Sequence, residues 1–165
     1  AGLAAIGEFK STQPNLITGA GSILDPERFQ QAVEAGADFV VSPGLDDDLR
    51  DAFAASPIPA FPGVATASEA MIARKAGIMR VKLFPASVIG GSDLITALST
   101  HLPDMTFMPT GGVTLANISV FLKMPNVYAV GGTWIAKPSL IEAGDWTSIT
   151  DRAREARNVA RSLRP

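Results

Sequence analysis

Two kinds of segment alternate along the chain. Short β-branched or otherwise apolar runs are followed by a small-residue turn containing Gly or Pro, and then by an amphipathic stretch. The turns start roughly 20 to 26 residues apart, which is the length of a strand–turn–helix–turn unit. They are GAGS (19–22), SPGL (42–45), FPGV (61–64), FPAS (84–87), PTGGV (109–113) and VGGTW (130–134).

The apolar runs predict six strands: NLITGAG (15–21), DFVVSPG (38–44), PIPAFPGV (57–64), RVKLFPA (80–86), TFMPTGG (106–112) and VYAVGG (127–132). Most are apolar on both faces, which is typical of parallel strands covered on both sides. Two helix patterns between them open at a capping residue, Asp25 or Thr66. These patterns end near a glycine, Gly36 or Gly77. Alternating strands and helices predict an α/β fold with a parallel sheet.

Each predicted strand leads into a turn rich in Gly, Pro, Ser or Thr, as expected if the strand ends surround one central site. This favours a (β/α)8 TIM barrel, although small residues also simply make tight turns. A complete barrel needs eight units, whereas this sequence has six and opens on a helix pattern, AGLAAIGEFKST. We therefore expect residues 1–165 to form a single barrel domain that is N-terminally incomplete by about two strands. Such an open sheet would expose edges that aggregate or associate.

One lysine lies inside a predicted strand. Of the five lysines, Lys82 alone is mid-strand, two residues before a turn, where a barrel strand points alternate side chains inward. Desolvation there would make the neutral amine accessible near pH 7, and a neutral amine attacks a carbonyl to form a Schiff base. Arg80 shares its face and either lowers that pKa further or lies at the solvated bottom of the barrel, which we favour. The alternative for Lys82 is a surface lysine on an edge strand.

Glycine pairs follow the last two predicted strands. Consecutive glycines let backbone N–H groups approach an anion closely, and phosphate sites of barrels often form after these strands. Isolated glycine pairs are common in turns, but two in succession are more informative. The candidate phosphate cradle consists of Thr110, Gly111, Gly112, Gly132 and Thr133.

Composition excludes several classes of function. The chain has 165 residues, 47% of them hydrophobic, and a net charge of −2, as in a soluble globular domain. It has no cysteine, which removes disulfides and thiolate chemistry. No apolar run approaches the roughly 20 residues of a membrane span, and no secretory signal is seen. The arginines of residues 152–164 scatter around one helix, which favours a solvated face over nucleic-acid binding.

The remaining polar residues give no metal or acid–base site. His101, the only histidine, is expected in a loop at the bottom of the barrel, where it would be a poor general base. The acidic run DDD (46–48) is interpreted as helix capping, although acidic triplets occasionally hold Mg²⁺. We expect no metal and no cofactor.

Taken together, GAGS, VVSPGL, FPGVAT, RVKLFPA, PTGGV and VGGTW in this order resemble the class I aldolases of 2-keto-3-deoxy-6-phosphogluconate (KDPG) and 2-keto-4-hydroxyglutarate (KHG). The resemblance covers essentially the whole chain. It implies a trimeric (β/α)8 barrel in the cytoplasm that cleaves KDPG to pyruvate and glyceraldehyde 3-phosphate through a lysine Schiff base. This is sugar-acid catabolism of the Entner–Doudoroff type.

The resemblance also implies roles for individual residues. Lys82 looks like the Schiff-base lysine and Phe84 like a wall of the substrate pocket. Thr110, Gly111 and Gly112 resemble the carboxylate and phosphate contacts, and Thr133 stands where the family uses Ser for phosphate. Further pocket residues by similarity are Ser22, Pro43 and Thr66.

The sequence departs from the family at its start. The family's catalytic Glu lies in a motif of the form EVTLRT on the second strand, and no such segment is found here. The alternatives are a KHG or phosphogalactonate aldolase, an isomerase or epimerase barrel with carboxylate bases, or a non-catalytic barrel that binds a phosphorylated ligand.

Overall fold

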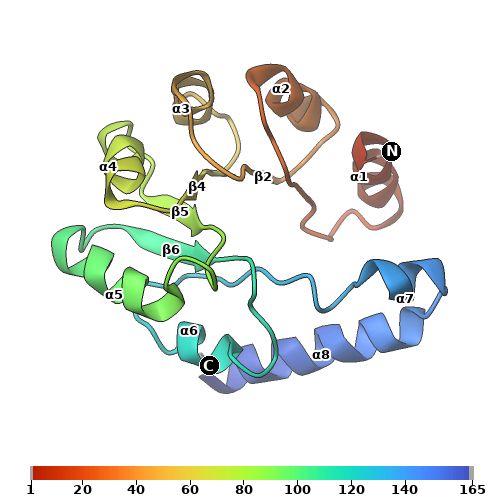
Figure 1. Ribbon diagram of the computed structural model, residues 1–165. Coiled ribbons are helices and arrows are strands. Elements are labelled where there is room, and N and C mark those ends of the chain that lie inside the picture. The colour runs from red at the N-terminus through yellow and green to blue at the C-terminus, as the bar shows by residue number, and fades with distance from the viewer. Residues whose placement is uncertain (1, 164–165) are drawn as a thin grey trace. The chain divides into compact units, whose positions relative to one another are not determined.

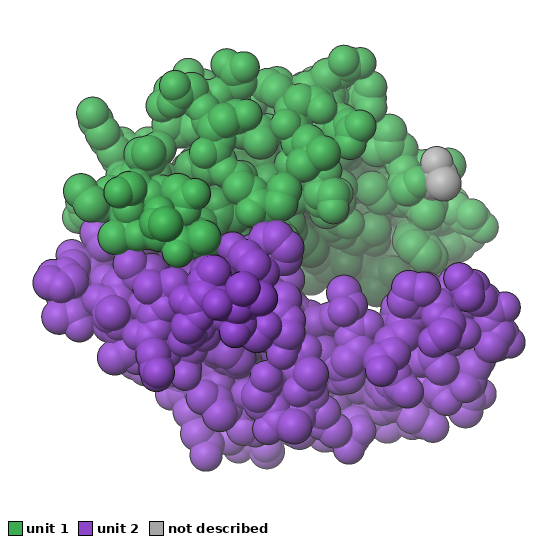
Figure 2. Space-filling view, viewed as in Figure 1, with its two compact units in different colours: residues 1–82 green, residues 83–165 purple. Residues whose placement is uncertain are grey.

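The computed structural model describes residues 2–163, and contacts divide the chain into two compact units, residues 1–82 (unit 1) and 83–165 (unit 2) (Figure 2). Strands and helices alternate through much of the chain (Figure 1). Unit 1 contains α1 (Gly2–Thr12), β1 (Gly19–Ala20), α2 (Pro26–Glu34), β2 (Phe39–Val41), α3 (Asp47–Ala54), β3 (Ala60–Phe61), β4 (Gly63–Val64) and α4 (Ala67–Lys75). β5 (Arg80–Leu83) ends at the first residue of unit 2, which continues with α5 (Gly91–His101), β6 (Thr106–Pro109), α6 (Ile118–Leu122), α7 (Pro138–Glu142) and α8 (Trp146–Leu163).

Strands β1, β2 and β3 of unit 1 are short and parallel. β1 pairs with β2, and β2 pairs with β3. The predicted strand PIPAFPGV is split at Pro62 into β3 and β4, because proline cannot donate to a strand ladder. On the helix side of these strands, α2 packs on α3, where the rings of Phe29 and Phe53 meet edge to face at 5.5 Å between centroids.

The predicted helix ends of unit 1 are confirmed. Asp25 accepts a backbone hydrogen bond of 2.7 Å in the first turn of α2. Thr66 and Glu69 form a reciprocal capping box at the start of α4. Gly36 and Gly77 follow these helices with φ of +86° and +81°, a conformation that glycine adopts without strain.

An ion pair attaches α1 to the rest of unit 1. Lys10 Nζ donates to Asp38 Oδ1 at 2.7 Å, and Thr18 N donates to Asp38 Oδ2 at the same distance. The Lys10 ammonium, followed by the Thr18 amide, lowers the pKa of the Asp38 carboxyl below its usual range. Lys10 is therefore a structural residue that joins α1 to the β1–β2 region.

Unit 2 is built around Leu83 and β6. Phe107 and Leu83 are fully buried, together with Ile95 of α5. The predicted strand VYAVGG (127–132) is wrong as a continuous strand, since only Val127 and Gly131 form isolated parallel bridges beside β6. Pro109 explains the gap, because it has no N–H to donate to the neighbouring segment.

Two predicted polar features, His101 and the acidic run 46–48, lie at the ends of helices. His101 is the exposed last residue of α5, not a loop residue as predicted. Asp46 caps α3 through Leu49 N at 2.8 Å, as predicted for the DDD run. Among residues 2–163, no group of three or more acidic or histidine side chains could hold a metal ion, and no helix is long and apolar enough to cross a membrane. The single barrel domain over residues 1–165 stays a prediction.

Candidate functional site

Lys82 occupies the position that the strand pattern predicts. The neighbouring Val81 is completely buried, whereas Lys82 points to the other face of β5 and is half-buried. Its amide donates to Pro62 O at 2.8 Å, which fixes the strand beside β4. Burial lowers the pKa of the Lys82 ammonium below its ordinary value. The amine is therefore more readily neutral, and so more nucleophilic, than that of a solvated lysine. Arg80 is exposed, as we favoured.

The other predicted residues of unit 1 lie at the carboxyl ends of its strands. Ser22 follows β1 with φ of +58° and is exposed. Pro43 follows β2, and its carbonyl lies so close to Gly63 that any β-carbon there would clash. Thr66 is exposed, and its hydroxyl accepts from Glu69 N at 3.3 Å and donates to Glu69 Oε2 at 2.9 Å. Thr66 thus has a structural role as a helix cap, and its predicted contact with substrate stays a prediction.

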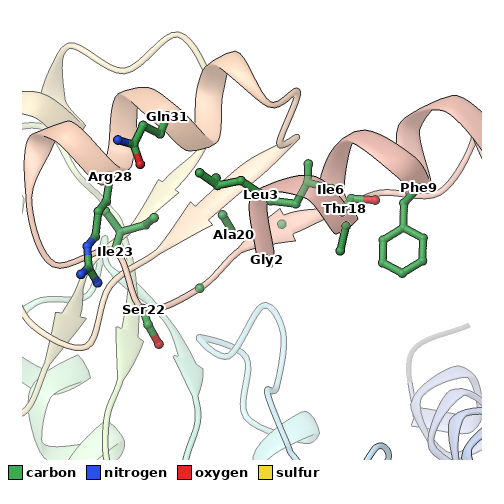
Figure 3. Close-up of a pocket in the computed structure, with 13 residues that line it drawn as sticks. Gly2, Leu3, Ile6, Phe9, Thr18, Ala20, Ser22, Ile23, Arg28 and Gln31 are labelled. Carbon is green, nitrogen blue, oxygen red and sulfur yellow. The ribbon is translucent and has the colours of Figure 1, made fainter. Parts of the chain in front are cut away.

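A pocket of about 650 Å³ lies between α1 and the segment from β1 to α2 (Figure 3). Apolar side chains such as Leu3, Ile6 and Phe9 form much of its wall. Ser22 lines this pocket, but Lys82 does not. This pocket is therefore separate from the predicted reactive lysine, which lies on β5.

In unit 2, the chain after β5 packs against the first glycine pair. Ala86 N donates to Thr110 O at 2.9 Å, and a β-carbon on Gly111 would lie 3.3 Å from the ring of Phe84. Gly111 and Gly112 have φ of +91° and +80°. Phe84 is half-buried and joined to Pro85 by a cis peptide bond. The FPAS and PTGGV turns are thus one packed structure.

The two glycine pairs lie side by side within unit 2. Thr110 and Gly131 form a bridge, and Gly131 N donates to Pro109 O at 2.9 Å. A β-carbon on Gly131 would lie 2.6 Å from Thr110 Oγ1, so a larger residue there would require the Thr110 side chain to move. Gly132 and Thr133 continue from this contact, with the Thr133 side chain exposed. The bridge therefore brings the two predicted glycine turns side by side, and their role as a phosphate cradle stays a prediction.

Sequence reasoning missed two residues beside this cradle. Ser87 is the last residue of the FPAS turn, but its contact with Gly112 can be seen only when the positions of both loops are known. Arg152 of α8 donates from Nη1 to Trp134 O at 2.8 Å. The periodicity of residues 152–164 marked Arg152 only as one of several surface arginines, and no sequence signal distinguishes it from the others.

A sequence model described as KDPG and KHG aldolase matches residues 1–152. The chain belongs to the KDPG and KHG aldolase family. It is 46% identical over 155 residues to the 2-dehydro-3-deoxy-phosphogluconate aldolase of Pseudomonas aeruginosa, a match that covers 94% of this chain and 70% of the relative. The family predicted from the motifs is thus confirmed.

Solved structures of KDPG aldolases support the same assignment. The enzyme of Legionella pneumophila, with pyruvate captured as a covalent carbinolamine intermediate, matches with a TM-score of 0.89 and 37% identity, over 95% of this chain and 75% of that one. The Zymomonas mobilis ZM4 enzyme, solved with 3-phosphoglycerate, matches with a TM-score of 0.84 and 36% identity, over 93% and 72%. KDPG aldolases are lyases with TIM-barrel-like α/β folds, so the predicted fold class is confirmed.

Proposed function

We propose that this protein is a class I aldolase that cleaves KDPG to pyruvate and glyceraldehyde 3-phosphate through a Schiff base on Lys82. The observation that carries the proposal is the half-buried Lys82 amine in the middle of β5, whose pKa is lowered by desolvation. The Legionella relative with pyruvate captured as a carbinolamine supports the same chemistry.

In the proposed reaction, neutral Lys82 adds to the C2 carbonyl of the substrate to give a carbinolamine. Loss of water yields a protonated imine, which accepts the electron pair when the C3–C4 bond breaks. The aldehyde product leaves, the resulting enamine is protonated at C3, and hydrolysis releases pyruvate and restores the amine. General acid–base catalysis of the proton transfers contributes about 10² to 10⁴ in rate. In the family a Glu has this role, and we assign it to no residue of this chain.

The substrate phosphate is proposed to bind at the two glycine pairs of unit 2. The support is the contact between Thr110 and Gly131, which places the two glycine turns side by side. Backbone N–H groups and a hydroxyl can bind a phosphate through hydrogen bonds without a direct arginine contact. By similarity to the family, we propose Phe84 as a wall of the substrate pocket and Ser22, Pro43 and Thr66 as further substrate contacts.

Substrates of the same family are the second candidate. KHG and the phosphogalactonate analogue of KDPG share the reacting keto acid and differ in the distal group or at one stereocentre, and the matching family model covers both KDPG and KHG aldolases. We further propose that the protein acts in the cytoplasm as a homotrimer, as the family resemblance implies.

A substrate panel tests this function. Release of pyruvate from KDPG, its phosphogalactonate analogue and KHG is measured with lactate dehydrogenase and NADH, on protein that melts cooperatively by circular dichroism. We expect the highest kcat/KM for KDPG. Failure of the folded protein to release pyruvate from any of the three would overturn the proposal, and sedimentation at several concentrations tests the trimer.

A further inference from the structure

One arginine of α8 differs from its neighbours on that helix. Arg152 is half-buried and donates to Trp134 O at 2.8 Å, across 18 residues of chain. By contrast, Arg154 lies on the exposed face, with 62% of its side chain accessible, and pairs with Asp151 one turn earlier. Arg152 thus makes a long-range contact from a helix that is otherwise largely solvated.

The carbonyl that Arg152 holds belongs to the second glycine turn. Trp134 closes VGGTW, and its indole ring fills the space that a β-carbon on Gly132 would need. At the other end of this turn, Gly131 N is bonded to Pro109 O at 2.9 Å. Gly132 and Thr133 therefore lie between two hydrogen bonds, one to β6 and one from Arg152.

Asp145, the residue before α8, carries a negative charge near Arg152. Asp145 accepts hydrogen bonds from Ser148 N at 3.0 Å and Ser148 Oγ at 2.7 Å, which fix its position at the start of α8. These bonds, and then the nearby charge of Arg152, lower the pKa of the Asp145 carboxyl. The guanidinium thus has a negative charge nearby in addition to its hydrogen bond to the Trp134 carbonyl.

We propose that Arg152 is a positioning residue for phosphate recognition: by holding Trp134 O, it fixes the Gly132–Thr133 segment in the conformation that receives the substrate phosphate. The inference rests on the proposed function. Preorganised donors bind an anion more tightly, because the loop does not have to be ordered on binding. Arg152 acts through the loop and makes no contact with the reacting carbons.

Two substitutions of similar length separate this role from simple packing. Arg152→Gln keeps an amide donor for Trp134 O, whereas Arg152→Met does not. For Arg152→Met we expect about a tenfold rise in KM for KDPG, with kcat within about twofold of wild type and KM for unphosphorylated KHG unchanged. Arg152→Gln should recover part of the affinity, and Arg154→Met, the matched control on the exposed face, should change neither constant.

A second measurement does not depend on turnover. Calorimetric titration compares binding of 3-phosphoglycerate with that of unphosphorylated glycerate to each variant. Selective weakening of 3-phosphoglycerate in Arg152→Met supports the inference even if wild type releases no pyruvate, an outcome that would overturn only the aldolase assignment. Equal losses for both ligands, no loss for either, or the same loss in Arg154→Met would overturn the role of Arg152.

Discussion

The side chain of Ser87 fills the space that a β-carbon on Gly112 would need. The two turns are held in this contact by Ser87 N, which donates to Gly111 O at 3.0 Å. Gly112 also has φ of +80°, where residues with a β-carbon are strained. Two independent constraints, backbone conformation and a close neighbour, therefore select glycine at the centre of the proposed phosphate site.

Alanine substitutions at Gly112 and at a second glycine should separate the effect of backbone conformation from that of the close neighbour. Gly77 has nearly the same φ, +81°, but nothing lies within 4 Å of an added β-carbon. Gly77→Ala should therefore lower the free energy of unfolding only by the backbone strain, about 1–2 kcal/mol. Gly112→Ala should lower the free energy of unfolding by about 1–3 kcal/mol more than Gly77→Ala, because the clash with Ser87 is added to the backbone strain. Urea unfolding of both variants measures the difference.

A Ser87→Gly background checks the cause of the extra loss. Removing the Ser87 side chain should bring the effect of Gly112→Ala close to that of Gly77→Ala, as a coupled pair requires. If the two substitutions at 112 and 87 are additive, the contact between the loops does not determine the glycine.

The Asp38 carboxylate should stabilise unit 1 in a pH-dependent way. Its folded-state pKa is lowered, first by Lys10 and then by Thr18 N, so its contribution is fully present above the unfolded pKa of about 3.9. That contribution is lost as the pH falls through the lower folded pKa. We expect Asp38→Asn to reduce the melting temperature at pH 7 and to converge with wild type in strong acid.

The matched control is an ion pair between two residues of the same helix, which connects no separate elements. Asp151 pairs with Arg154 one turn away on α8, and both side chains are 62% exposed. Such pairs contribute little, so Asp151→Asn should leave the melting temperature nearly unchanged. Equal effects of the two substitutions at neutral pH would contradict the anchoring role of Asp38.

The reactivity of Lys82 should rise with pH earlier than that of an ordinary lysine. Burial penalises the ammonium in the folded chain, so the amine becomes neutral below the usual value of about 10.4. By linkage, stability should also rise with pH between the folded and unfolded pKa values, because the unfolded chain binds more protons there. Rates of pyruvate adduct formation between pH 6 and 11, with Nα-acetyl-lysine as reference, measure the shift. A profile coincident with the reference would contradict it.

Local features of unit 1 followed from the sequence because short-range chemistry sets them. The caps at Asp25 and Thr66 and the left-handed glycines after α2 and α4 depend on residues within one or two turns. Lys82 could be recognised from the sequence because burying a charge inside an apolar strand costs free energy, which suggests a functional role. The breaks at Pro62 and Pro109 were missed because both prolines lie in runs that are otherwise apolar, and the pattern ignored their missing N–H groups.

Contacts between distant loops could not be predicted from the pattern. Ser87 meets Gly112, and Arg152 meets Trp134, only after β6 and α8 have packed. Arg152 sits in a run of similar arginines, and tertiary position alone makes it different. The sequence thus predicts the reactive residue of the proposed site, Lys82, but not Ser87 and Arg152, which contact its loops.

The most direct test of the account is borohydride trapping with pyruvate, followed by peptide mass mapping. We expect a reduced pyruvate adduct on the peptide that carries Lys82, and a loss of at least about 10³-fold in labelling for Lys82→Met, with the fold intact by circular dichroism. Lys75→Met, which removes an exposed lysine at the end of α4, should label like wild type. An adduct on a different lysine, or undiminished labelling of folded Lys82→Met, would contradict the assignment of Lys82 as the Schiff-base residue.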